Sequence, residues 1–131
     1  RYKWFIMKAL IGIISEENLR KRMLAIAAGK YTPEPGEPKV WFASLNAIGQ
    51  ILSNENITLL RMMAAHKPET ISELARLAGR QVSNLSTTLK TLESHGFVHL
   101  QRKGNTVKPT ALFTDFVIRV ESELLANGNA A

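Results

Sequence analysis

The stretch from Thr70 to Val98 most constrains the fold, because it predicts two helices separated by a glycine turn. Thr70 and Glu73 have the spacing of a capping box, so the first helix is expected to begin at Ile71. Gly79 and Gly96 are expected to end the two helices, since glycine tolerates the left-handed conformation common at helix C-termini. Each helix carries an apolar row at spacings of three and four residues. The rows are Ile71, Leu74, Ala75 and Ala78, then Val82, Leu85, Leu89 and Leu92. This order predicts a helix-turn-helix.

The side chains on the outer face of the second helix are almost all short hydrogen-bonding groups. A helix that faces only water more often carries Glu and Lys pairs, whereas Ser, Thr and Asn lower helix propensity. These groups can donate to and accept from base edges in the major groove of DNA. The alternative for any one of them is simple tolerance on a solvated face. The residues expected to read bases are Gln81, Ser83, Asn84, Thr87 and Thr88.

A hairpin with basic residues at its tip is predicted after the second helix. Residues 98–101 are expected to alternate between inward and outward positions, and Arg102 to Asn105 to form the turn. Val107 begins the return strand, and Pro109 is expected to limit further pairing. Two helices followed by a β-hairpin are the order of elements in a winged-helix domain.

Positive charge is concentrated on this part of the chain. The formal net charge is +6, and six basic residues oppose the single acid Glu93 between Arg76 and Thr110. Basic side chains that neutralise phosphates would give salt-sensitive DNA binding, and the alternative is a soluble basic surface. The residues expected to bind phosphate are Arg80, Lys90, Arg102, Lys103 and Lys108.

The run ELARLAGRQVSNLSTTLKTLESHGFVHLQRKGN resembles the DNA-binding core of MarR and ArsR type regulators of bacteria and archaea. With KVWFASLNAIGQILSNENITLLRMM added, residues 39–109 resemble a group of small winged-helix regulators proposed as antitoxins of toxin–antitoxin pairs. The resemblance implies a sequence-specific regulator of double-stranded DNA that represses its own operon. It also implies a homodimer and a cognate toxin protein as partner. The chain has no cysteine, so thiol-based sensing is not expected, and a reducing cytoplasm is compatible with this composition.

The expected fold class is mainly α with a small β-hairpin wing (α+β), with extensions at both ends. The first extension holds a strand and then a helix capped by Ser15, whose apolar stripe is Leu19, Met23, Ile26 and Ala27. A short strand at 40–42 and helices near 44–52 and 54–66 precede Thr70. The expected divisions are a strand-helix extension at 1–29, a proline-rich linker at 30–39, the DNA-binding domain at 40–112, and a C-terminal helix at 113–131.

Two segments are candidates for joining protomers, since a two-fold protein on a pseudo-palindrome needs a dimer surface. The N-terminal strand, Leu10 to Ile14, could pair with its symmetry mate through an unpaired edge. If the antitoxin likeness holds, this strand and the basic run Arg20 to Arg22 would contact the toxin. The N-terminal strand and the C-terminal helix could each instead fold back onto the core of their own protomer. The C-terminal helix offers the expected dimerisation residues Phe113, Phe116, Val120 and Leu124.

Enzyme chemistry is not expected, because three histidines, one aspartate and no cysteine leave few sets for nucleophilic or metal chemistry. His95 and His99 are four residues apart, but a glycine and the start of a strand separate them. No cofactor and no metal is expected. The apolar run at 2–14 is shorter than the roughly 20 residues that span a membrane. The remaining alternative is a winged-helix module that binds and neutralises a protein partner without specific DNA binding, which exposed apolar residues on the second helix would favour.

Overall fold

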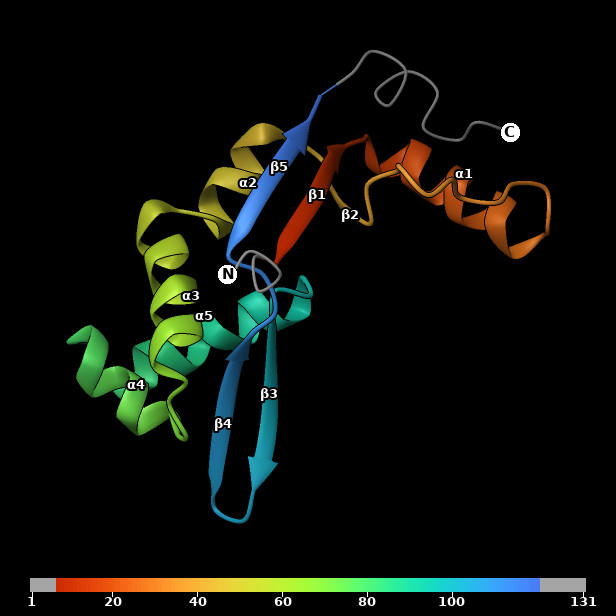
Figure 1. Ribbon diagram of the computed structural model, residues 1–131. Helices are drawn as coiled ribbons and strands as arrows, with labels where there is room; N and C mark the ends of the chain where they lie inside the picture. The colour runs from red at the N-terminus through yellow and green to blue at the C-terminus, as the bar shows by residue number, and fades with distance from the viewer. Residues whose placement is uncertain (1–6, 121–131) are drawn as a thin grey trace, which may run out of the picture. The chain divides into compact units, whose positions relative to one another are not determined.

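The computed structural model describes residues 7–120, which form five helices and five strands in a mixed α and β fold (Figure 1). Contacts divide them into two units. The first contains Met7 and residues 51–115, and the second contains residues 8–50 and 116–120. None of the helices in the described part is long and apolar enough to cross a membrane.

The first unit contains three helices and a hairpin. The bounds are α3 Asn54–His66, α4 Ile71–Ala78, α5 Val82–Ser94, β3 Val98–Lys103 and β4 Thr106–Ala111. The Thr70 hydroxyl accepts the Glu73 N–H at 3.0 Å, which confirms the predicted start of α4. The Glu73 carboxylate in turn accepts the N–H of Glu69 at 2.9 Å. Gly79 ends α4 with a φ of 66°, the left-handed conformation expected from its sequence position.

The core of the first unit joins all three helices to the hairpin. Its residues share near-complete burial and come from every one of these elements. They are Leu59, Leu60, Met63, Leu74, Ala75, Leu85, Leu89, Leu92, Phe97, Val98 and Ala111. The predicted apolar rows of α4 and α5 are therefore confirmed at their central positions, while Val82 at the start of α5 is 46% exposed.

The hairpin is longer than the sequence predicted, because Pro109 does not end the pairing. β3 and β4 pair antiparallel from Val98 with Ala111 to Lys103 with Thr106, and Leu100 lies opposite Pro109. The Leu100 N–H donates to a Glu93 carboxylate oxygen at 3.2 Å and so points away from β4. We infer that Leu100 and Pro109 occupy a non-hydrogen-bonded position of the ladder, where the missing proline N–H costs nothing.

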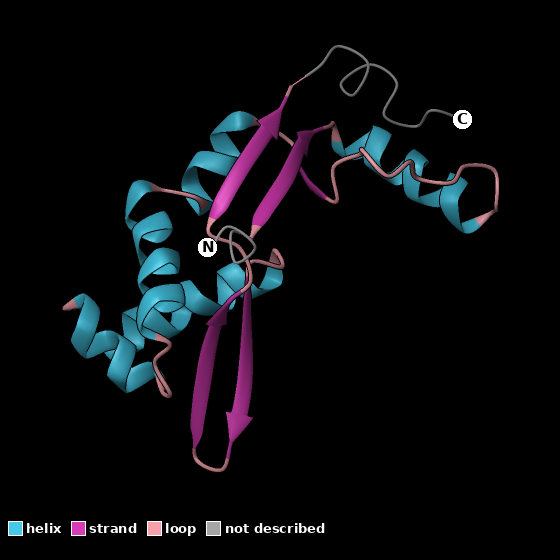
Figure 2. Ribbon diagram, viewed as in Figure 1, coloured by secondary structure: helices cyan, strands magenta, loops and turns pink. Residues whose placement is uncertain are grey.

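The second unit is built on a three-stranded sheet in the order β2-β1-β5 (Figure 2). Its elements are β1 Lys8–Ile13, α1 Glu16–Ala27, β2 Val40–Phe42, most of α2 Leu45–Ile51, and β5 Asp115–Arg119 from Phe116 onward. β1 and β2 are parallel, with Ile11 paired to Val40 and Ile13 to Phe42. β1 is the central strand, so the prediction that it could pair with a symmetry mate is wrong.

The predicted linker is part of this second unit. Residues 30–39 lie between α1 and β2, and the contacts group residues 40–50 with β1 and α1 rather than with the helices that follow. The Lys39 N–H donates to the Leu10 carbonyl at 3.3 Å, and Pro38 is buried. The segment predicted as a linker at 30–39 thus falls inside one unit, whose β1 it meets through Lys39, while Pro33 and Pro35 are exposed.

Helix α1 buries a different face from the predicted one. The buried residues are Arg22 and Ala25, whereas Met23 is 61% and Leu24 63% exposed. The Arg22 guanidinium forms an ion pair with Glu37 and lies 4.9 Å from the ring centroid of Tyr31. It lies 5.0 Å from the Trp41 ring centroid. Burial lowers the pKa of Arg22 from its usual value. Arg22 is therefore not available to the toxin contact predicted for the basic run.

The predicted C-terminal helix is wrong over its described residues. Asp115 to Arg119 form strand β5, which lies beside β1 and runs in the same direction (Figure 1). The β-branched residues Val117 and Ile118 favour an extended strand, and β1 offers an edge along which this strand can pair. Phe116 is half-buried and Val120 is exposed. Leu124, the last of the predicted dimerisation residues, lies outside the described residues.

The Arg22 cluster generates a prediction about stability. Arg22→Ala leaves the mostly buried Glu37 carboxylate without its cation and should lower the free energy of unfolding by about 3 kcal/mol. Arg20→Ala, on the exposed face of the same helix, is the matched control and should change it by less than about 0.5 kcal/mol. Urea unfolding followed by circular dichroism measures both variants. Equal effects of the two substitutions would contradict the role assigned to the cluster.

Candidate functional site

The outer face of α5 carries the residues that the sequence predicted to read bases. Gln81, at the N-cap, together with Ser83, Asn84 and Thr87, is exposed, and Thr88 is half-buried. Leu85, Leu89 and Leu92 are buried on the inner face of α5, so the packing of the helix determines which groups face outward. No aromatic side chain is present within α5.

Arg80 does not stand apart from this face. Its Nη2 donates to Asn84 Oδ1 at 2.8 Å and to the Thr88 hydroxyl at 3.1 Å. The spacing of four residues places Asn84 and Thr88 one above the other on α5, within reach of a side chain from the preceding turn. Arg80 was predicted to bind phosphate, and the structure places its guanidinium beside two predicted base-reading residues.

The threonine hydroxyls of α5 are oriented by its own backbone. Thr87 donates to the Ser83 carbonyl at 3.3 Å, and Thr91 donates to the Thr87 carbonyl at 3.2 Å. Because each hydroxyl proton is used inside the helix, the hydroxyl oxygen that remains outward acts as an acceptor. Asn84 presents its amide N–H groups as donors, since its oxygen accepts from Arg80. The face thus holds donors and acceptors at separate positions.

The hairpin and the loop before α4 share an electrostatic cluster that sequence reasoning missed. Lys103 Nζ lies 3.8 Å from one carboxylate oxygen of Glu69, and Lys108 Nζ lies 3.5 Å from the other. Glu69 is close to Thr70 in sequence but more than thirty residues from both lysines. No local pattern connects them, so no sequence signal could have identified Glu69 as their partner.

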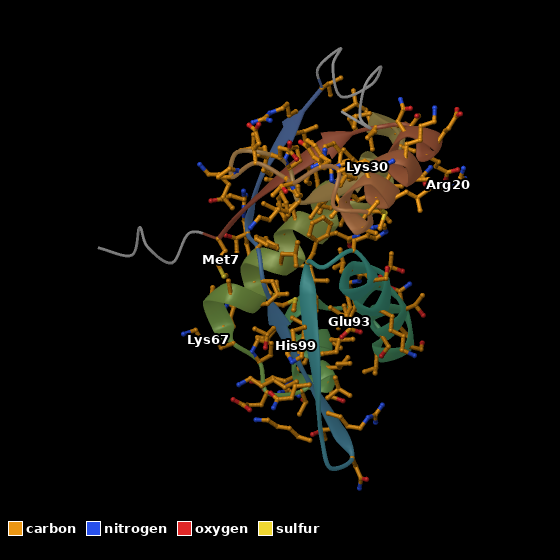
Figure 3. All side chains as sticks on the ribbon, turned by 90° about the vertical axis from the view of Figure 1, so that its right-hand side faces the viewer. Met7, Arg20, Lys30, Lys67, Glu93 and His99 are labelled. Atoms are coloured by element: carbon orange, nitrogen blue, oxygen red, sulfur yellow. The ribbon has the colours of Figure 1, made fainter. Side chains whose placement is uncertain are left out.

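The other two predicted phosphate-binding residues lie across a groove. Lys90 on α5 and Arg102 on β3 both line it, together with Ile71, Ser86, Glu93, Leu100 and Val107. The bond from the Leu100 N–H to Glu93 holds α5 against β3, and Figure 3 shows the two elements beside each other near Glu93 and His99. The exposed outer face of α5 and the basic hairpin therefore belong to one packed unit.

Phe113 is half-buried and packs against the core of the first unit. Its ring meets Phe97 edge-on, with centroids 6.4 Å apart, and Phe97 is fully buried. Such aromatic pairs stabilise a core beyond their buried area. Part of the Phe113 ring is therefore engaged within its own protomer, and its role in dimerisation stays a prediction.

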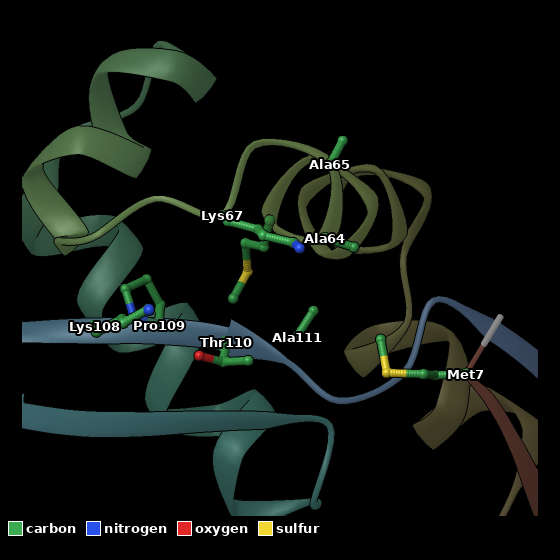
Figure 4. A pocket seen from close by; sticks show the side chains of 9 residues that line it. Met7, Ala64, Ala65, Lys67, Lys108, Pro109, Thr110 and Ala111 are labelled. Atoms are coloured by element: carbon green, nitrogen blue, oxygen red, sulfur yellow. The ribbon is translucent and has the colours of Figure 1, made fainter. Parts of the chain in front are cut away.

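A cavity of about 690 Å³ lies in the first unit between the C-terminal part of α3 and β4 (Figure 4). Its charged lining residues are Lys67 and Lys108. Lys67 adopts a left-handed backbone with a φ of 48° where α3 ends before Pro68. The rest of the lining is mostly apolar, from Met7, Met63, Ala64, Ala65, Pro109, Thr110 and Ala111. One of the two cations, Lys108, is already paired with Glu69.

Metal chemistry has no set of ligands in the part of the chain that the structure describes. No group of three or more His, Cys, Asp or Glu side chains there could hold a metal ion. His95 follows α5 as its C-cap and stacks on Phe97 at a centroid distance of 6.3 Å, whereas His99 is on β3. The two histidines therefore do not share a helix face.

The chain was compared with curated proteins and with models of protein families. No curated protein matches the chain. A family model described as HVO_A0114 matches residues 51–118, which contain α3, α4, α5 and the hairpin. The designation of this family names no ligand and no activity. Because the match extends over more than half of the sequence, the chain belongs to the HVO_A0114 family.

Proposed function

We propose that this chain is a sequence-specific regulator that binds double-stranded DNA through a winged helix and represses its own operon. The observation that carries the proposal is the outer face of α5, where exposed hydrogen-bonding groups lie on a helix fixed beside a basic hairpin. An α-helix fits the major groove of B-DNA, where each base pair presents a distinct set of donors and acceptors. In this proposal α5 is the recognition helix, and its occupancy of the promoter blocks transcription.

The base-reading roles follow from the donor and acceptor positions on α5. The Asn84 amide would donate to an acceptor such as guanine O6 or purine N7, and Thr87 would accept from adenine or cytosine amino groups. The bond from Arg80 restricts the Asn84 side chain to one orientation. A pre-oriented side chain loses less conformational entropy on binding, which favours selective contact.

The hairpin would act as the wing and bind phosphates. Arg102 and Lys103 stand at its tip, and Gly104 with a φ of 60° makes the two-residue turn between them and β4. Contacts of this kind position a protein on the duplex without reading its sequence. They also make affinity fall as salt rises, because each neutralised phosphate releases counterions.

Binding of a protein partner is favoured on a different surface of the chain, helix α1. Met23 and Leu24 on α1 are both more than half exposed, and large apolar side chains dominate protein interfaces. On α5 the exposed aliphatic residue is Val82, at the first turn, and the remaining outer residues are polar. A partner such as the toxin of an antitoxin pair would therefore contact α1, and DNA would contact α5.

Base-reading residues should affect sequence preference. Asn84→Ala and Thr87→Ala should each weaken binding to the DNA upstream of the protein's own gene by about 1–3 kcal/mol. Binding to a shuffled duplex of equal length should change little, because that binding does not use base contacts. Fluorescence anisotropy with both duplexes measures the two affinities. Equal losses on the two duplexes would refute base reading by α5.

Phosphate-binding residues should show the opposite behaviour in the same assay. Arg102→Gln and Lys103→Gln should weaken binding to both duplexes alike, and each should reduce the slope of log K against log salt by about one. Arg20→Gln, on the exposed face of α1, is the matched loss of one positive charge and should leave the slope unchanged. A slope that responds equally to all three substitutions would indicate only a general charge effect.

Glu69 should restrain DNA binding, because its carboxylate is held near the ammonium groups of Lys103 and Lys108. Glu69→Gln should tighten binding to both duplexes and steepen the salt slope, since two cations would then lack an internal counterion. Glu34→Gln removes the same charge from the exposed 30–39 segment and serves as the control. Weaker binding by Glu69→Gln would mean that Glu69 positions the lysines for DNA instead of competing with it.

A further inference from the structure

Strand β5 forms an edge of the second unit's sheet. Within residues 7–120 the sheet ends at β5, and no described strand lies beyond it. Val117 is 42% and Ile118 43% exposed. Successive residues of a strand point to opposite faces, so both faces of β5 leave an apolar side chain uncovered. This pattern is expected of a strand that lacks a neighbour on one side.

The two edges of this sheet differ in protection. The β2 edge is only three residues long, which limits the backbone groups that it offers to another chain. The β5 edge is five residues long, and its centre, Phe116 to Ile118, has no lysine, no proline and no glycine. Natural edges are usually blunted by such residues or by bulges. The centre of β5 therefore favours pairing with a further strand.

The sequence of β5 is complementary to itself in the antiparallel direction. When two copies of Asp115–Arg119 are aligned about Val117, Asp115 lies opposite Arg119 of the second copy. Phe116 lies opposite Ile118, and Val117 lies opposite its own equivalent. Residues directly opposite each other share a face of the sheet, so each carboxylate meets a guanidinium. Shifting the register by one or two residues separates both charge pairs.

We propose that a second copy of this chain pairs antiparallel with β5, so that the two three-stranded sheets join into one across a two-fold axis at Val117. A two-fold interface uses the same surface on both protomers, which requires a self-complementary strand of this kind. The pairing also satisfies outward-facing backbone groups of the edge. This dimer does not depend on DNA binding, although a two-fold protein suits two half-sites.

The existing contacts of the charged ends are compatible with this pairing. Asp115 Oδ1 lies 3.4 Å from Arg61 Nη2, and Arg119 Nη2 donates to the Gly36 carbonyl at 3.2 Å. A carboxylate can accept about four hydrogen bonds and a guanidinium can donate five, so each group can serve an internal and an external partner. The internal contacts hold both side chains at the ends of the strand.

Charge reversal tests the register directly. Arg119→Asp places two carboxylates opposite each other at both ends of the paired strands, and Asp115→Arg places two guanidiniums there. Each variant alone should weaken the dimer by about tenfold or more, because two attractive pairs become repulsive. An equimolar mixture should form a 1:1 heterodimer, since one chain then supplies only carboxylates and the other only guanidiniums. Sedimentation equilibrium without DNA measures the masses.

A second variant and a control keep the test decisive if charge reversal harms folding. Val117→Lys places two ammonium groups at the two-fold axis and should give a monomer with an unchanged far-ultraviolet spectrum. Leu24→Lys changes an apolar residue of α1 that is 63% exposed and should remain a dimer. A monomeric wild-type protein would overturn the proposal. So would β5 variants that stay dimeric while Leu24→Lys dissociates. Because no DNA is present, neither result bears on the proposed DNA binding.

Discussion

The buried leucine row of α5 is the constraint on which the candidate site depends. Leu85, Leu89 and Leu92 are fully buried against the rest of the first unit. Once this row is buried, the rotation of α5 about its axis is fixed, and with it the identity of every outward side chain. The hydrogen bond from the Leu100 N–H of β3 to the Glu93 carboxylate then holds the hairpin beside α5. The hydrogen-bonding face and the basic hairpin are consequences of the same packing.

The second unit is organised around a buried charge. Arg22 contacts the rings of Tyr31 and Trp41 and pairs with Glu37, so one side chain of α1 holds the proline-rich segment and β2 together. Removing a guanidinium from water is costly, and here aromatic rings and a carboxylate offset that cost. Burying Arg22 leaves Met23 and Leu24 on the outside. The first unit thus presents the exposed polar face of α5, and the second presents exposed apolar side chains on α1.

The sequence predicted the features that depend on neighbouring residues. The bounds of α4 and α5 were predictable because Thr70, Gly79 and Gly96 act within a few residues of their own positions. The buried face of α1 was not predictable, since it depends on rings and a carboxylate up to nineteen residues away. β5 was mistaken for a helix because its apolar spacing fits both periods, and the edge of β1 decided between them. The pairing of Glu69 with two lysines depends wholly on tertiary structure.

Selection from a random pool of duplex DNA tests the central claim most directly, because it requires no knowledge of the operator. The purified full chain is incubated with the pool, and bound duplexes are recovered and compared with the input at two salt concentrations. Base reading by α5 predicts a recurrent motif whose preference over shuffled DNA persists at the higher salt, since base contacts are less sensitive to salt than phosphate contacts. Binding without any enriched motif that disappears at the higher salt would contradict it.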